Sequence, residues 1–166
     1  MEPGAAPAPV RPPSRPFWVA PLGWAAFTAA FIYGLAYADL TLRARSAYLE
    51  GEKYMAWSSD PKAKAAFFDA ELSKRTGELK AEFERGKMTK EELAQRLALA
   101  KFSRDEAVAE SSLKYAYVWY QTAVELFSPP ESRWVVLSRA KMGRAKEAWK
   151  AELRAKKIPF EDYMLD

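Results

Sequence analysis

The sequence PFWVAPLGWAAFTAAFIYGLAYADL, residues 16–40, decides how the rest of the chain is interpreted. From Phe17 to Ala38 it contains 22 residues without a charged side chain. As an α-helix this run is about 33 Å long, close to the ~30 Å hydrocarbon thickness of a bilayer. Aromatic residues near both ends resemble the interfacial belts of membrane helices: Trp18, Trp24, Tyr33 and Tyr37. The stretch therefore predicts a transmembrane helix over residues 17–40, since a soluble core helix of this length normally carries polar residues on one face.

A cleavable signal peptide is the alternative interpretation of the same stretch. Arg11 and Arg15 precede the apolar run, and Ala36-Tyr37-Ala38 before Asp39 has the small-x-small form of a cleavage site. The apolar run is, however, longer than the ~7–15 residues usual for signal peptides. We expect a retained anchor.

The orientation of this anchor stays open. Basic residues near its ends number two before the helix and three after it: Arg11 and Arg15, then Arg43, Arg45 and Lys53. Because the positive-inside rule counts such residues, this difference does not decide the side of the membrane. We expect a single-pass protein of a bacterial inner membrane or an equivalent energy-transducing membrane.

Small residues recur every fourth position along the anchor, at Ala26, Ala30, Gly34 and Ala38. Such a ridge lets another membrane helix approach closely, so we expect helix packing there. The plain alternative is that alanine is simply frequent in this stretch. The preceding segment, residues 1–16, is rich in proline and is expected to be a flexible, extended tail.

The composition excludes several kinds of chemistry. The chain has no cysteine and no histidine, so it cannot form disulfides, thiol or imidazole metal sites, or a serine–histidine nucleophile. Adjacent carboxylates such as Glu91 and Glu92 are typical of a solvated helix surface. We expect no enzyme activity, no cofactor, no metal and no small-molecule substrate.

After the anchor, helix signals predict an all-α domain over residues 41–157. The first helix continues to Trp57, and the cap Asp60 followed by Pro61 starts a second that ends near Arg85. The capping box Thr89–Glu92 starts a third helix, which can extend to 127 with an internal break at the second capping-box sequence over 103–106. A fourth helix is expected over 131–157. Stripes at helical spacing predict the core and include Leu72, Leu79 and Phe83, then Leu93, Leu97 and Ala100.

Two stretches resemble the tetratricopeptide repeat. The first carries Gly51, Tyr54, Ala63, Phe67 and Ala70; the second carries Ala116, Tyr120, Ala123, Pro129, Trp134 and Leu137. Together they cover less than half of the chain. The resemblance implies antiparallel helical hairpins that act as a protein-binding scaffold. A generic helical bundle is the alternative. The segment ERGKMTKEEL, residues 84–93, is similar to a short oligomerisation hairpin of bacterial proteins.

The last predicted helix is strongly basic. Residues 133–157 contain nine basic and two acidic side chains, a net charge of +7. This surface is a candidate contact for anionic lipid, for an acidic partner subunit, or for solvent alone. The contact residues we single out are Arg133, Arg139, Lys141, Arg144, Lys146, Lys150, Arg154, Trp134, Phe160 and Tyr163.

The C-terminal tail, residues 158–166, is both apolar and acidic. We expect it to pack on the helical domain or to insert into a partner.

These features predict an accessory or scaffold subunit of a larger membrane complex, which contacts other subunits and membrane lipid but no nucleic acid. The alternative is a membrane-anchored, tetratricopeptide-like adaptor that recruits a soluble partner. A groove lined by aromatic residues would favour the adaptor: Tyr115, Tyr117, Trp119, Tyr120 and Trp134.

Overall fold

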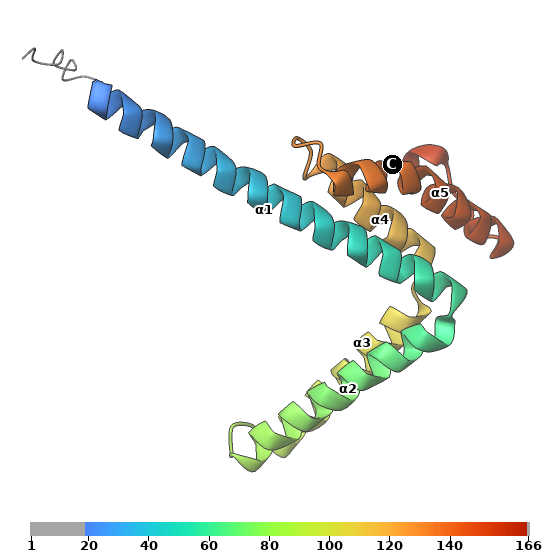
Figure 1. Ribbon diagram of the computed structural model, residues 1–166. Helices are drawn as coiled ribbons and strands as arrows, with labels where there is room; N and C mark the ends of the chain where they lie inside the picture. The colour runs from blue at the N-terminus through green and yellow to red at the C-terminus, as the bar shows by residue number, and fades with distance from the viewer. Residues whose placement is uncertain (1–18, 166) are drawn as a thin grey trace, which may run out of the picture. The chain divides into compact units, whose positions relative to one another are not determined.

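The computed structural model describes residues 19–165, with side chains from residue 21 onward (Figure 1). The expected tail over residues 1–16 and the interfacial Trp18 lie outside the described residues. Five α-helices follow one another: α1 (Val19–Ser59), α2 (Pro61–Glu84), α3 (Lys90–Ala109), α4 (Ser112–Glu125) and α5 (Arg133–Ala155). A short 3-10 helix, η1 (Asp162–Leu165), follows. No strand occurs in residues 19–165, which confirms the all-α prediction for this part of the chain.

The described residues divide into two compact units, with the boundary between Asp39 and Leu40. In the first unit, every side chain from 21 to 39 is exposed, including the small residues Ala26, Ala30, Gly34 and Ala38. The rings of Trp24, Phe27 and Phe31 pack along one side of the helix, with centroids 6.0 and 6.3 Å apart. By length and composition, α1 is the one described helix suited to cross a membrane.

Local capping sets several helix boundaries, as the sequence predicts. The Asp60 carboxylate accepts hydrogen bonds from the Lys62 and Ala63 amides, both at 3.1 Å, and Pro61 opens α2. At the start of α3, the Thr89 hydroxyl accepts a hydrogen bond from the Glu92 amide, and the Glu92 carboxylate accepts one from the Thr89 amide. Each cap satisfies amide donors that the first turn leaves without helical partners.

The predicted interruption of the third helix is present, but it lies at residues 110–111 and not at 103–106. Residues 103–106 lie inside α3, where Arg104 forms ion pairs with Asp69 at 2.6 Å and with Asp105 at 2.9 Å. The helix ends instead at Ala109, and Ser111 caps α4 by accepting from the Lys114 amide at 3.2 Å. The physical reason is a distant side chain, since the Lys64 ammonium binds the carbonyls of Val108 and Glu110 where α3 ends.

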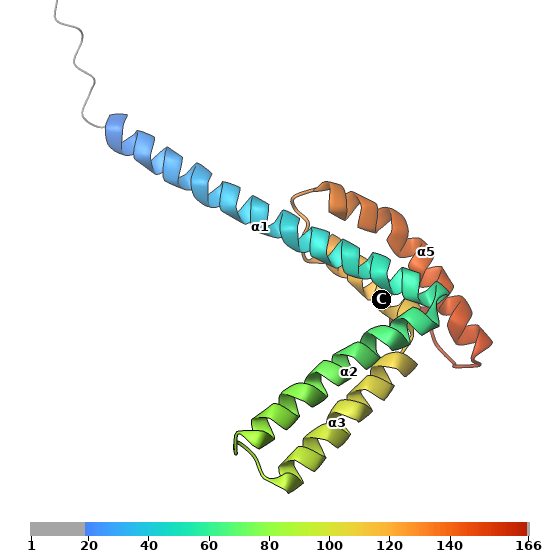
Figure 2. The ribbon, with the colours of Figure 1, turned by 60° about the horizontal axis from the view of Figure 1, so that its bottom comes forward.

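In the second unit, the main core lies between α4, α5 and residues 40–59 of α1 (Figure 2). Its buried apolar residues come from all three helices: Ala44, Ala47, Ala116, Tyr117, Tyr120, Ala123, Val135 and Ala145. The Gly51 backbone approaches the Tyr120 ring so closely that a Cβ there would lie 2.5 Å from Cε1. Small residues on α1 therefore let large rings of α4 fill the core.

The α2 and α3 helices form an antiparallel hairpin (Figure 2). At its base, the ring of Trp57 packs against Phe67 and Phe68, with centroids 5.1 and 5.7 Å apart. Because α3 contributes no buried side chain, this hairpin has a much smaller core than the rest of the unit.

Candidate protein-binding groove

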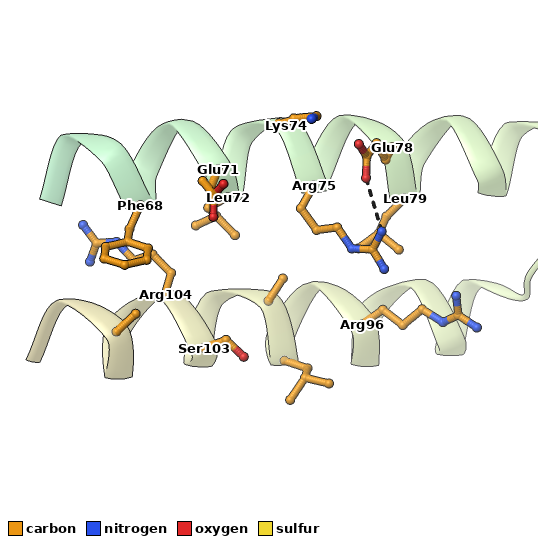
Figure 3. A pocket seen from close by; sticks show the side chains of 13 residues that line it. Phe68, Glu71, Leu72, Lys74, Arg75, Glu78, Leu79, Arg96, Ser103 and Arg104 are labelled. Carbon is orange, nitrogen blue, oxygen red and sulfur yellow. Dashed lines mark hydrogen bonds and ion pairs between the residues drawn. The ribbon is translucent and has the colours of Figure 1, made fainter. Parts of the chain in front are cut away.

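A groove of about 620 Å³ runs between α2 and α3 (Figure 3). Apolar side chains from both helices line it: Phe68, Leu72, Leu79, Leu99, Ala100 and Ala107. Ser103 and six charged side chains complete the lining: Glu71, Lys74, Arg75, Glu78, Arg96 and Arg104. An apolar floor with charged edges is the usual surface on which a partner helix is bound.

The apolar residues of this groove are incompletely covered by the chain itself. Leu79 is 1% exposed, whereas Leu99 is 64% exposed. Apolar residues at helical spacing predict which face of each helix is apolar. Two helices packed together cover only part of both apolar faces, and the rest stays exposed unless a third element packs on it. The predicted core residue Phe83 is likewise 38% exposed.

Ion pairs hold the charged edges in place. Arg75 reaches Glu78 at 3.2 Å on α2, and Figure 3 shows this pair along one side of the groove. Arg104 crosses from α3 to Asp69 on α2, at 2.6 Å. Hydrogen bonds to Asp105 and Asp69 raise the pKa of Arg104, so its charge is permanent. The groove is therefore a pre-formed surface whose edges carry ion-paired charges.

A polar network joins the three helices of the main core. Glu52 on α1 accepts two hydrogen bonds from the Lys141 ammonium on α5, at 2.7 and 2.6 Å, and one from the Tyr120 hydroxyl on α4. Burial alone would raise the pKa of Glu52, but the bonds from Lys141 and Tyr120 and the Lys141 charge lower it overall. The Glu52 hydrogen bond raises the pKa of Lys141. Both groups are thus held ionised, which suits a structural ion pair and not a proton-transfer pair.

A buried charge, Lys64, lines a cavity of about 350 Å³ beside the α3–α4 junction. Lys64 is 3% exposed and donates to the carbonyls of Val108 at 3.2 Å and Glu110 at 2.6 Å. Burial lowers the pKa of Lys64, and the charges of Glu110 and Glu152 act in the opposite direction. Because its ammonium is engaged by two carbonyls, Lys64 joins α2 to the end of α3 and is poorly placed to attack a substrate.

Many of the basic residues predicted on α5 contact acidic or aromatic side chains of the same chain. Several are neutralised within the chain: Arg139 by Glu131 at 2.7 Å, Lys141 by Glu52, and Lys150 by Asp162 at 2.9 Å. Arg133, Lys146 and Arg154 lie over the rings of Trp134, Tyr117 and Phe160 respectively, and Arg144 is exposed. Tyr163 is 73% exposed.

The aromatic residues expected to line an adaptor groove are partly in the core. Tyr117 and Tyr120 are 5% and 0% exposed, and Tyr115 stacks on Tyr54 with centroids 5.2 Å apart. Sequence reasoning missed the α2–α3 groove because it assigned Leu72, Leu79 and Ala100 to a closed core. The apolar residues at helical spacing were the signal present in the sequence. A groove differs from a closed core only because no third helix covers these residues.

Comparisons with protein-family models, with curated proteins and with solved structures find no match to this chain. Among residues 19–165, no group of three acidic side chains is placed to hold a metal ion.

Proposed function

We propose that this chain is a single-pass accessory or scaffold subunit of a larger membrane complex, as in a bacterial inner membrane. Residues 17–40 anchor it in the bilayer, and the α2–α3 groove binds a helix of another subunit. The chain contributes contacts and no chemistry of its own.

The open groove is the observation that carries this proposal. It has an apolar floor, ion-paired edges and a volume of about 620 Å³, while α3 buries no side chain within the chain. A partner helix laid along it would cover Leu99, Leu72 and Phe68. Burying a fully exposed leucine side chain contributes about 1.5–3 kcal/mol, so a few such contacts support a stable interface.

The adaptor alternative would bind a soluble partner on the aromatic residues of α4 and α5. Burial of Tyr117 and Tyr120 removes two of its five expected contact residues from the surface. The resemblance to tetratricopeptide repeats remains a prediction, and it is compatible with either role.

The experiment is extraction of native membranes with a mild detergent, followed by native-gel separation and mass spectrometry. We would compare the wild-type chain with Leu99→Lys, which places a charge in the groove. Ala98→Lys is the matched control, because it adds the same charge to an exposed position of α3 outside the groove lining.

Co-migration of the wild-type chain and Ala98→Lys in one large assembly, with loss of Leu99→Lys from it, is the expected result. A full-length chain that migrates alone would instead favour the adaptor. Recovery in the soluble fraction, starting at Asp39, would overturn the anchor and the proposal with it.

A further inference from the structure

Within the unit that begins at Leu40, the start of α5 lies beside residues 45–48 of α1. The Arg45 guanidinium lies 5.8 Å from the centre of the Trp134 ring, and the Tyr48 and Trp134 rings are 5.5 Å apart. At 1.5 Å per residue, Arg45 is about 8 Å and Tyr48 about 12 Å from Leu40 along the helix. The height of each residue above Leu40, measured perpendicular to the membrane, cannot exceed these distances, whatever the tilt of the helix.

The directions of the helices place the α4–α5 connection at this same end of the unit. Tyr54 and Tyr48 on α1 pair with Tyr115 and Tyr120 on α4, so these helices are antiparallel. The contacts Arg45–Trp134 and Glu52–Lys141 show that α5 runs parallel to α1. If the antiparallel pairing of α1 with α4 is continued past these contacts, Leu126 lies level with residue 42 of α1. Both views show the segment between α4 and α5 beside this part of α1 (Figures 1 and 2).

At this end of the unit, exposed aliphatic side chains lie near a tryptophan that two arginines contact. Leu42, Leu126 and Val136 are 60%, 68% and 51% exposed. Arg45 and Arg133 both lie over the Trp134 ring, at 5.8 and 5.6 Å from its centre. Tryptophan and arginine with exposed aliphatic neighbours are the side chains that favour the layer between hydrocarbon and water.

We propose that this end of the unit, defined by Leu42, Arg45, Leu126, Arg133, Trp134 and Val136, rests on the phospholipid headgroups of the bilayer that α1 enters. The inference depends on the membrane anchor of the proposed function. The occupant follows from covalent continuity, since the chain passes at Leu40 into the apolar stretch. The headgroup layer adds about 5–8 Å on each side of the hydrocarbon, which matches the height of Arg45 above Leu40.

The proposal assigns lipid contact to the start of α5 and not to its whole basic length. Ala155, the last residue of α5, lies 21 residues beyond Trp134, or about 32 Å further along the helix. Its basic neighbour Lys156 pairs with Glu152 at 2.5 Å.

The absence of cysteine allows a direct test with single introduced thiols. We would reconstitute the full chain in vesicles of phosphatidylcholine with one quarter phosphatidylglycerol, and attach a fluorophore to Leu126→Cys or Val136→Cys. Ala155→Cys is the distal control, and Phe31→Cys reports on the anchor. Quenching is measured with nitroxide on the lipid headgroup and, separately, on the acyl chain.

Headgroup nitroxide is expected to quench the probes at 126 and 136 at least about threefold more than the probe at 155, given their heights along the helices. If acyl-chain nitroxide quenches the probe at 31 while those at 126 and 136 behave like 155, the inference is overturned and the anchor stands. If the chain does not float with the vesicles and the probe at 31 is unquenched, both are overturned.

Discussion

Lys141 on α5 holds the carboxylate of Glu52 on α1, although 89 residues separate them in the sequence. The same carboxylate accepts the hydroxyl of Tyr120, which is completely buried. One acidic side chain thus connects α1, α4 and α5 where small residues bring these helices together. The stability of the main core is expected to depend on its ionisation.

Glu52→Gln should reduce the loss of unfolding free energy that occurs as the pH is lowered. The folded-state pKa of Glu52 is lowered from 4.5, so its stabilising contribution is present above that value and is lost as the pH falls through the folded pKa. Unfolding of the full chain in detergent, followed by circular dichroism, should show a wild-type loss of stability below about pH 5 that the variant lacks in part.

The control for this experiment is Glu147→Gln. Glu147 is 66% exposed and pairs with Lys150 one turn away, at 3.3 Å, so its removal should change the loss of stability at low pH little. Equal losses at low pH for wild type and Glu52→Gln would show that the network contributes nothing to pH dependence.

Gly51→Ala should destabilise the core by roughly 1–3 kcal/mol, because the added Cβ would lie 2.5 Å from Cε1 of Tyr120 and the core is closely packed. Tyr120 cannot easily move away, since it is fully buried and its hydroxyl is bound to Glu52. The measurement is the free energy of unfolding from urea titration.

Gly77→Ala is the matched control within helix α2. No heavy atom lies within 4 Å of a Cβ added at Gly77, and alanine is favoured over glycine inside a helix by up to about 1 kcal/mol. The two substitutions should therefore change stability in opposite directions. A stabilising Gly51→Ala would mean that the close approach of α1 and α4 is wrong.

Much of the secondary structure was predictable because its causes are local. The cap Asp60–Pro61 and the box Thr89–Glu92 act within three residues, and the apolar run of α1 needs no partner to be recognised. The end of α3 was not predictable in this way. It depends on Lys64, which is 44 and 46 residues from the carbonyls that it binds.

The candidate site was less accessible to sequence reasoning than the helices. Periodicity identifies the apolar faces of Leu72 and Leu99, but it does not say whether a third helix covers them. In the same way, the net charge of the last helix gave no sign that Lys141 and Lys150 find acidic partners within the chain. Such pairings depend on the tertiary arrangement.

Lys64→Met should destabilise the second unit by about 1–3 kcal/mol, because it removes the donor that satisfies the Val108 and Glu110 carbonyls. Hydrogen exchange followed by mass spectrometry should show faster exchange where α3 ends and α4 begins. Lys62→Met, at an exposed position two residues earlier, is the control and should leave exchange there unchanged. Similar exchange in both variants would contradict the role of Lys64 as a link between α2 and this junction.

Leu165→Ala should lower the free energy of unfolding by about 1–2 kcal/mol, since Leu165 is only 6% exposed and its burial fixes the end of the chain. The neighbouring Met164 is 58% exposed, so Met164→Ala should have almost no effect and serves as the control. Deletion of residues 158–166 should destabilise more than Leu165→Ala, because it also removes the Lys150–Asp162 ion pair at 2.9 Å and the contact of Arg154 with Phe160. If the deletion leaves thermal unfolding unchanged, the tail does not stabilise the helical unit, and its apolar residues are then better explained as a contact with another subunit.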